Sequence, residues 1–149
     1  MRILFVCLGN ICRSPMAEGV FTHLAAERGL SLEFDSAGTG GWHAGEAPDR
    51  RMQQTAHGHG IDITGLRARK FERADFDRFD IIYAMDESNQ RDILALARSR
   101  EDQEKVRLIL NEVYPGENMS VPDPYYGGQN GFEHVYDLLK RAAENVLSK

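Results

Sequence analysis

The residues with the clearest capacity for chemistry lie in one short stretch near the amino terminus, residues 7–14 (CLGNICRS). A thiol, Cys7, stands at one end of it and a guanidinium, Arg13, near the other. The residues between them can curl the backbone so that its N–H groups point at a common centre, and a helix beginning near Ser14 adds partial positive charge there. Arg13 offers a planar fork that suits two oxygens of one oxyanion. The stretch therefore predicts a cradle for a dianion with a sulfur nucleophile at its floor.

The residues of this loop also have a structural interpretation. Cys7 taken alone would be a buried cysteine after a strand, because cysteine is among the most buried residue types. The neighbouring residues favour a nucleophile instead, since Gly9 lets the backbone approach an anion and Asn10 tolerates a left-handed conformation. A hydrogen bond from Ser14 would favour the thiolate form of the sulfur. The candidate substrate-binding residues of the loop are Leu8, Gly9, Asn10, Ile11, Cys12 and Ser14.

A second candidate group surrounds Asp123, which stands between two prolines. A carboxylic acid there could protonate the oxygen that leaves a phosphate ester and, once ionised, accept a proton from an attacking water. Tyr125 and Tyr126 could form an aromatic wall against a flat substrate ring. The alternative is a rigid structural turn with packed tyrosines, because the flanking prolines restrict the backbone. The residues alone leave both interpretations open.

Three further residues are candidates with weaker signals. Trp42 follows a glycine-rich run and is either a core residue or a second aromatic wall for substrate. His43 is the one histidine expected near the site, and the histidines show no metal-ligand spacing, so no metal site is predicted. Cys12 is either a small packed residue or a redox partner that closes a reversible disulfide with an oxidised Cys7.

The bulk properties of the chain narrow the class of protein. Its 149 residues suit one domain, residues 1–149, and the net charge of −5 with scattered Lys and Arg argues against nucleic-acid binding. The only two cysteines lie in one loop and form no disulfide framework, which favours a reducing, cytoplasmic compartment. No apolar run has the length of a signal-peptide core or a membrane span.

Hydrophobic patterning predicts an α/β fold: a single doubly wound domain whose four-stranded parallel sheet carries helices on both faces, with the phosphate-binding loop after the first strand. In such a sheet ligands bind beyond the carboxyl ends of the strands, so Cys7, residues 38–43, Asp86 and Asp123 are expected at one rim. The expected strands are residues 2–6, 32–35, 79–85 and 106–110, and the expected helices are residues 14–28, 48–57, one containing 93–97, and 132–147.

Two of these motifs carry a family resemblance. Residues 7–15 (CLGNICRSP) and 123–127 (DPYYG) resemble the low-molecular-weight protein tyrosine phosphatases, including bacterial members, and residues 36–39 and 85–89 look like further family stretches. The resemblance spans essentially the whole chain. It implies a doubly wound fold, a phosphocysteine intermediate on Cys7, Arg13 as phosphate clamp, Asp123 as general acid and base, and no cofactor. It also implies phosphotyrosine-containing proteins, among them a tyrosine kinase, as partners and inorganic phosphate as product.

Competing classes share parts of this pattern. Relatives that dephosphorylate arginine carry threonine where this chain has Ile11, and the bulkier Ile11 fits the tyrosine phosphatases better. Thiol arsenate reductases need further cysteines to relay a disulfide, and none follows Cys12. A phosphocarrier domain would not need Asp123, and a phosphotyrosine-binding module would need neither Cys7 nor Asp123 as reactive groups.

Overall fold

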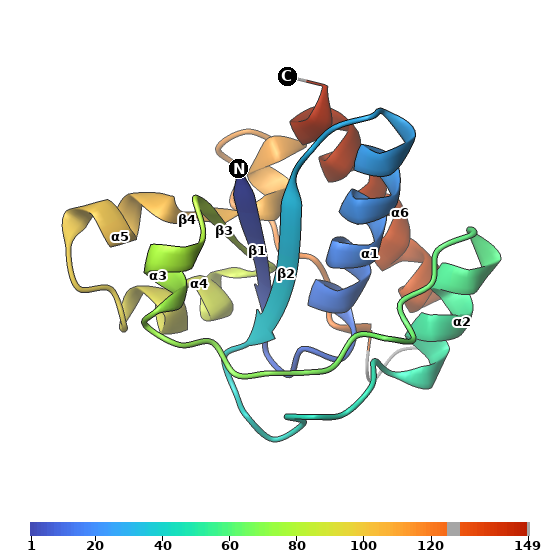
Figure 1. Ribbon diagram of the computed structural model, residues 1–149, viewed down its shortest axis with the longest axis horizontal. Coiled ribbons are helices and arrows are strands. Elements are labelled where there is room, and N and C mark those ends of the chain that lie inside the picture. Colours follow the sequence, from blue (N-terminus) through green and yellow to red (C-terminus); the bar gives the residue numbers. More distant parts are fainter. Residues whose placement is uncertain (125–128, 149) are drawn as a thin grey trace.

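The centre of the protein is a parallel sheet of four strands, which the computed structural model shows with helices against both of its faces (Figure 1). The structure describes residues 1–124 and 129–148. The strand order in the sheet is β2-β1-β3-β4, and in the register of the central pairs Ile3 lies opposite both Phe34 and Ile81. The strands are β1 Arg2–Cys7, β2 Glu33–Gly38, β3 Ile81–Ala84 and β4 Val106–Leu108.

The helices form two layers, one on each face of the sheet (Figure 1). The first layer holds the long helices that pack on one another, and the second holds three short helices on the opposite face. A 3-10 turn, η1 Ile109–Glu112, follows β4 and contacts the last helix. The first layer consists of α1 Arg13–Glu27, α2 Arg50–Gly58 and α6 Gln129–Leu147, and the second of α3 Asp75–Arg78, α4 Glu87–Leu94 and α5 Arg100–Lys105.

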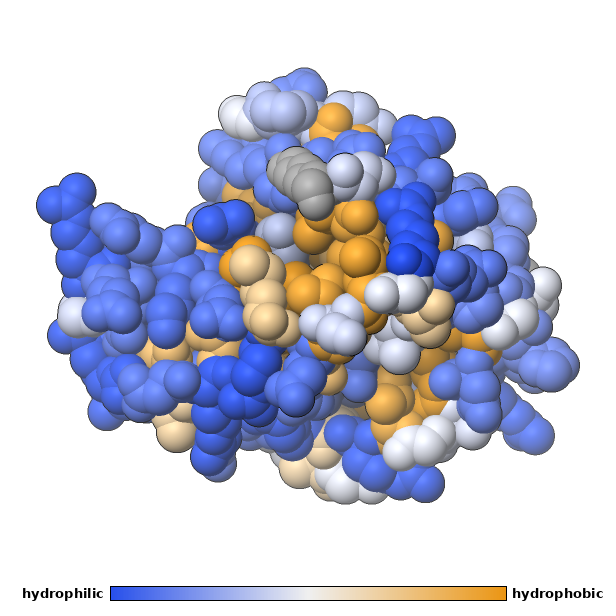
Figure 2. Space-filling model, turned by 45° about the horizontal axis from the view of Figure 1, so that its top comes forward, coloured by the Kyte–Doolittle hydropathy of each residue, from blue (hydrophilic) through white to orange (hydrophobic). Residues whose placement is uncertain are grey.

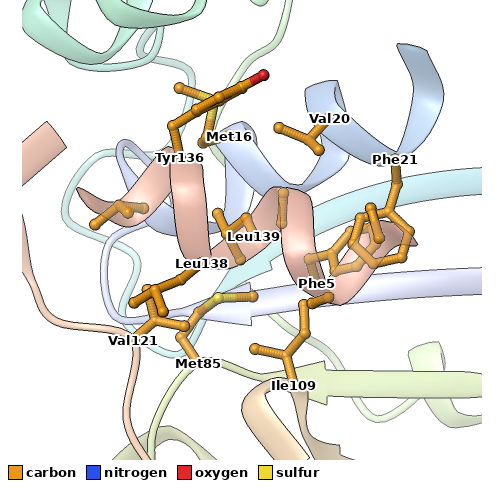
Figure 3. Close-up of a cluster of buried hydrophobic side chains, with 14 of the residues drawn as sticks. Phe5, Met16, Val20, Phe21, Met85, Ile109, Val121, Tyr136, Leu138 and Leu139 are labelled. Carbon is orange, nitrogen blue, oxygen red and sulfur yellow. The ribbon is translucent and has the colours of Figure 1, made fainter. Parts of the chain in front are cut away.

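Alternation along the central strand divides the core into two parts. Ile3 and Phe5 of β1 point into the cluster beneath α1 and α6, whereas Leu4 and Val6 point into the cluster on the other face. All four are essentially inaccessible to solvent, as expected for a strand covered on both faces. Figure 3 shows the larger cluster, in which side chains of α1 and α6 interlock above β1.

The predicted fold class and the order of the main elements are confirmed, but several boundaries were wrong. The second strand does not stop at residue 35, because residues 36–38 continue to pair with β1 up to the Cys7–Gly38 pair. The fourth strand ends at Leu108 rather than residue 110, since the buried Ile109 and Leu110 belong to the 3-10 turn. An apolar run signals burial, and it does not distinguish a strand from a buried turn.

The second layer of helices was predicted least well. Helix α4 begins after its N-cap Asp86, as its sequence suggested, but it ends at Leu94 and so excludes residues 95–97. Helices α3 and α5 were not predicted, because four and six largely polar residues contain too little apolar periodicity to read.

The two ends of the sheet differ in character. The loop between β1 and α1, the connection after β2 and residues 121–124 lie at the carboxyl ends of the strands, while the N-terminus and the last turn of α6 lie at the opposite end (Figure 1). With that end tipped toward the reader, the visible surface is mainly hydrophilic around a central apolar area (Figure 2), and the exposed apolar side chains of the described residues include Met1 and Leu30. None of the helices in the described residues has both the length and the apolar character needed to cross a membrane.

Candidate active site

The loop between β1 and α1 is shaped by a left-handed residue and by an uncapped helix start. Asn10 has a φ of 58° and is almost fully buried. Within the described part of the chain, the N-cap residue of α1, Cys12, makes no side-chain hydrogen bond to the first-turn amides. The N–H groups of Arg13 and Ser14 are therefore not capped by the Cys12 side chain, and an uncapped helix start with its positive dipole end suits an oxyanion.

Three side chains of this loop form a hydrogen-bonded chain that ends at the sulfur. Asn10 Nδ2 donates to Ser14 Oγ at 2.8 Å, and Ser14 Oγ lies 3.0 Å from Cys7 Sγ. Because Asn10 donates to the hydroxyl, the hydroxyl proton remains available for the sulfur or for the Ala37 carbonyl at 3.4 Å. The contact with Ser14 holds Cys7 Sγ in a defined position within the loop.

The Arg13 side chain is buried and oriented by groups from two other segments. Its Nη1 donates to Asp86 Oδ2 at 2.7 Å and to the Val121 carbonyl at 3.0 Å, while Nη2 lies 3.9 Å from Asp123 Oδ2. Burial opposes the charge of the guanidinium, but the negative charges of Cys7 and Asp86 outweigh burial and raise the pKa of Arg13. Among the described residues both hydrogen bonds of the guanidinium come from Nη1, so its other edge can bind two oxygens of one anion.

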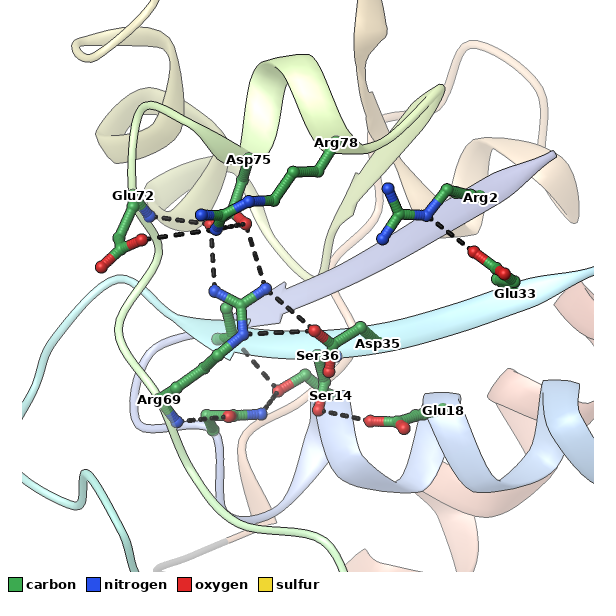
Figure 4. Close-up of polar contacts among 12 residues, drawn as sticks. Arg2, Ser14, Glu18, Glu33, Asp35, Ser36, Arg69, Glu72, Asp75 and Arg78 are labelled. Atoms are coloured by element: carbon green, nitrogen blue, oxygen red, sulfur yellow. Dashed lines mark hydrogen bonds and ion pairs between the residues drawn. The ribbon is translucent and has the colours of Figure 1, made fainter.

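The position of Asn10 depends on Arg69, in the irregular segment that precedes α3. The Arg69 backbone N–H donates to Asn10 Oδ1 at 3.0 Å. The Arg69 guanidinium is held between Asp35 of β2 and Asp75 of α3, with contacts of 3.0–3.2 Å (Figure 4). The Asp75 side chain is fully buried and also accepts from the Glu72 backbone N–H at 2.8 Å. A bridge between β2 and α3 therefore fixes Arg69, whose backbone N–H holds Asn10 of the loop between β1 and α1.

A pocket of about 190 Å³ opens over the loop and gathers residues from distant parts of the sequence. Trp42 and His43 are among the residues that line it, and Trp42 is 71% exposed, so it is not a core residue. Asp123 lines the pocket from the connection before α6. The predicted wall residues Tyr125 and Tyr126 lie outside the described residues. The full lining comprises Cys7, Leu8, Gly9, Ile11, Cys12, Arg13, Trp42, His43 and Asp123.

The two cysteines are both free thiols, and the raised pKa of Cys12 keeps its thiol protonated at neutral pH. Burial, together with the negative charge of Asp49, raises the pKa of the Cys12 thiol well above its ordinary range. A protonated thiol is a poor nucleophile, so Cys12 does not compete with Cys7 for an electrophile in the pocket.

The sequence indicated the candidate catalytic residues but not most of the residues that hold them in place. Asp86 was expected at the rim without a role, and the structure places it as the hydrogen-bond partner of Arg13. Arg69 and Asp75 were not singled out, and no local pattern marks them. Within residues 1–124 and 129–148, no group of three or more His, Cys, Asp or Glu side chains is arranged to hold a metal ion.

Comparisons with known proteins agree with this geometry. The family described as low molecular weight phosphotyrosine protein phosphatase matches residues 2–149. A Synechocystis protein whose name assigns it to the low molecular weight protein-tyrosine-phosphatases is 47% identical over 99% of this chain and 95% of its own length. The crystal structure of a protein tyrosine phosphatase from Entamoeba histolytica superimposes with a TM-score of 0.93 at 38% identity, covering 100% of this chain and 96% of its own. The Drosophila arginine phosphatase structure superimposes with a TM-score of 0.92 at 36% identity, covering 99% and 97%.

Proposed function

Because the chain belongs to the low molecular weight phosphotyrosine protein phosphatase family, whose members are phosphoric monoester hydrolases, we propose that it hydrolyses phosphotyrosine through a cysteinyl-phosphate intermediate. We propose further that residues 1–149 act as one phosphatase domain. The observation that carries the proposal is that Cys7, Arg13 and Asp123 line one pocket, where they could act as nucleophile, anion clamp and proton donor.

In the first step the Cys7 thiolate attacks phosphorus, forming the S–P bond as the bond from phosphorus to the tyrosyl oxygen breaks. Asp123 in its protonated form gives its proton to the leaving oxygen, so that tyrosine departs as a neutral phenol. Arg13 and the loop amides bind the phosphoryl oxygens while their negative charge redistributes in the transition state. The hydrogen bond between Arg13 and Asp86 supports this role, because it fixes the guanidinium before substrate arrives.

In the second step a water attacks the cysteinyl phosphate, and the S–P bond breaks to regenerate the thiolate. Asp123, now a carboxylate, accepts the proton of the attacking water, and inorganic phosphate is released. Ser14 stabilises the departing sulfur through the contact of 3.0 Å already present in the structure. The cycle returns every group to its starting protonation state without an added co-reactant.

Substrate selection is assigned to the rim of the pocket. Trp42 and the apolar side chains of Leu8 and Ile11 line the entrance and suit a flat aromatic ring above the phosphate. The proposed partners are phosphotyrosine-containing proteins, among them a tyrosine kinase. A cysteine nucleophile works only while reduced, which supports a reducing, cytoplasmic compartment.

The experiment that tests the proposal compares phosphotyrosine, phosphoserine and phosphoarginine peptides of the same sequence, assayed with and without a metal chelator. We expect hydrolysis of the phosphotyrosine peptide to dominate, to persist with the chelator and to be inhibited by vanadate, a phosphate mimic. The Cys7→Ser variant should bind the phosphotyrosine peptide without turning it over. Turnover by that variant would mean that another group is the nucleophile, and full loss of activity on chelation would contradict the mechanism.

Phosphoarginine is the second candidate substrate, because the Drosophila arginine phosphatase shares this fold at 36% identity. Ile11 lines the pocket and presents a branched apolar side chain rather than a hydroxyl. An apolar wall favours an aryl group over a charged guanidinium, so we rank phosphotyrosine first. A phosphoarginine peptide hydrolysed faster than its phosphotyrosine counterpart would reverse this order.

A further inference from the structure

The ring of Trp42 occupies the space where any residue other than glycine at position 40 would place its side chain. An ideal Cβ built on Gly40 lies 1.8 Å from Trp42 Cζ3, 2.3 Å from Cε3 and 2.4 Å from Cη2. Real Cβ atoms do not approach other heavy atoms within 3.0 Å, so the six-membered part of the indole rests directly on the Gly40 backbone. No other contact of this kind made by the described glycines is as short.

The backbone conformation at Gly40 does not itself call for glycine. The glycines with positive φ among the described residues are Gly29, Gly45, Gly60 and Gly116, and Gly40 is not one of them. A residue with a side chain could therefore follow the same backbone path without strain. What excludes a side chain at this position is the indole ring.

Gly40 is also tied to the loop that carries the nucleophile. Its backbone N–H donates to the Leu8 carbonyl at 2.9 Å, and the preceding Thr39 N–H donates to the Cys7 carbonyl at 2.9 Å. A ring that rests on Gly40 therefore has a defined position relative to the sulfur, although its other face is open to solvent. A free, 71% exposed tryptophan would otherwise sample several rotamers.

We propose that Gly40 is a positioning residue. Because Gly40 has no side chain, the indole of Trp42 can rest on its backbone and form a wall of the pocket that favours aryl phosphates. The inference rests on the proposed function, because the seated ring is taken to stack on the aromatic ring of phosphotyrosine. Aromatic stacking of this kind changes a rate or affinity by about 2- to 10-fold. A methyl group at position 40 should displace the indole and remove that advantage, while the phosphate-binding loop beneath it keeps its own contacts.

The matched pair of variants is Gly40→Ala and Gly41→Ala. At Gly41 the nearest atom to an ideal Cβ is Lys70 Cδ at 3.5 Å, an ordinary contact distance, so this control adds a methyl group one residue away without touching the ring. The substrates are a phosphotyrosine peptide and acetyl phosphate, whose leaving group is not aromatic. We expect Gly40→Ala to lower kcat/KM about 2- to 10-fold for the peptide and to leave acetyl phosphate near the wild-type value. Gly41→Ala should leave both unchanged.

A double mutant shows whether Gly40 acts through the ring. With Trp42→Ala already present, Gly40→Ala should have no further effect on kcat/KM, because the ring it displaces is gone. Equal losses for both substrates, or a further loss in the Trp42→Ala background, would show that Gly40 supports the loop rather than the wall and would overturn the inference.

A readout independent of catalysis separates this inference from the proposed function. Trp42 is the only tryptophan of the chain, so the emission spectrum and acrylamide quenching report its environment directly. Gly40→Ala should shift both, and Gly41→Ala should shift neither. An unchanged Gly40→Ala spectrum would refute the claim that Gly40 positions the Trp42 ring, and it would leave the proposed phosphotyrosine hydrolysis unaffected. A wild-type protein inactive on phosphotyrosine would refute the proposed function, and with it the selective role of Gly40, even if the spectra change as expected.

Discussion

Replacing Glu18 with glutamine should remove a pH-dependent loss of stability that the wild-type protein suffers near neutrality. Glu18 lies on the side of α1 that faces β2, where Ser36 Oγ donates to its Oε1 at 2.8 Å. Burial raises the pKa of Glu18 from 4.5 to about 7, and the hydrogen bond from Ser36 offsets burial only in part. The neighbouring Asp35 carboxylate raises it further, while Arg69 lowers it.

The sign of the effect follows from proton binding. Between pH 4.5 and about 7 the folded protein keeps the Glu18 proton while the unfolded chain has lost it, so the folded state binds more protons. The contribution of this proton to stability is complete below pH 4.5 and disappears as the pH rises through about 7. At about 1.4 kcal/mol per pH unit, the interval from 4.5 to about 7 corresponds to at most about 3.5 kcal/mol. Partial exposure of the side chain reduces this to about 1–3 kcal/mol.

The assay is urea unfolding of the wild-type protein and Glu18→Gln at pH 5 and pH 8.5. The amide has the shape of the protonated acid and no charge at either pH, so the two proteins should be similar near pH 5. At pH 8.5 the variant should be more stable by about 1–3 kcal/mol. The matched control is Glu27→Gln, which removes a carboxylate from the same helix at a position where the side chain is 61% exposed. Its unfolding free energy should follow that of the wild type at both pH values. Parallel pH dependences for the wild type and Glu18→Gln would refute the reasoning.

Three further predictions concern the site and its supports. Asp123→Ala should lower kcat/KM, which reports the leaving-group step, about 10²- to 10⁴-fold for a phenyl phosphate and much less for a nitrophenyl phosphate, whose leaving group needs no proton; an equal loss of kcat/KM for both would exclude Asp123 as the acid. Asp86→Asn should weaken vanadate binding about 10- to 100-fold, because Arg13 loses a charged hydrogen bond, and unchanged inhibition would show that Arg13 is held without it. Asp75→Asn should lower the unfolding free energy by about 3 kcal/mol and also reduce kcat. A loss of stability with unchanged kcat would show that Arg69 does not position the loop.

The sequence predicted the parts of the site whose chemistry is local. The spacing from Cys7 to Arg13 encodes a strand end, a tight loop and a helix start, and each of these depends on neighbours within one turn. The buried strands were equally readable, since continuous apolar runs in an α/β chain have few other interpretations. Asp123 was expected at the same rim as Cys7, and the structure adds that both side chains line one pocket.

The roles of the residues at the rim of the pocket were harder to predict, because these roles depend on packing in three dimensions rather than on a sequence pattern. Trp42 could have been a core residue or a wall, and nothing in the glycine-rich run before it distinguishes the two. The structure resolves this through the contact between the ring and the Gly40 backbone, which is a property of shape.

The geometry of the sulfur depends on contacts that no local pattern encodes. Asn10 can hold Ser14 only if its own side chain is fixed, and the group that fixes it is the backbone N–H of Arg69. Arg69 is held in turn by Asp75, a fully buried carboxylate whose desolvation costs several kcal/mol unless its oxygens are hydrogen-bonded. The two guanidinium contacts of Arg69 and the Glu72 backbone N–H supply those bonds. The stability of residues 69–75 and the orientation of Cys7 are therefore coupled. A change that loosens Asp75 should lower both, although Asp75 lies on the other face of the sheet from α1.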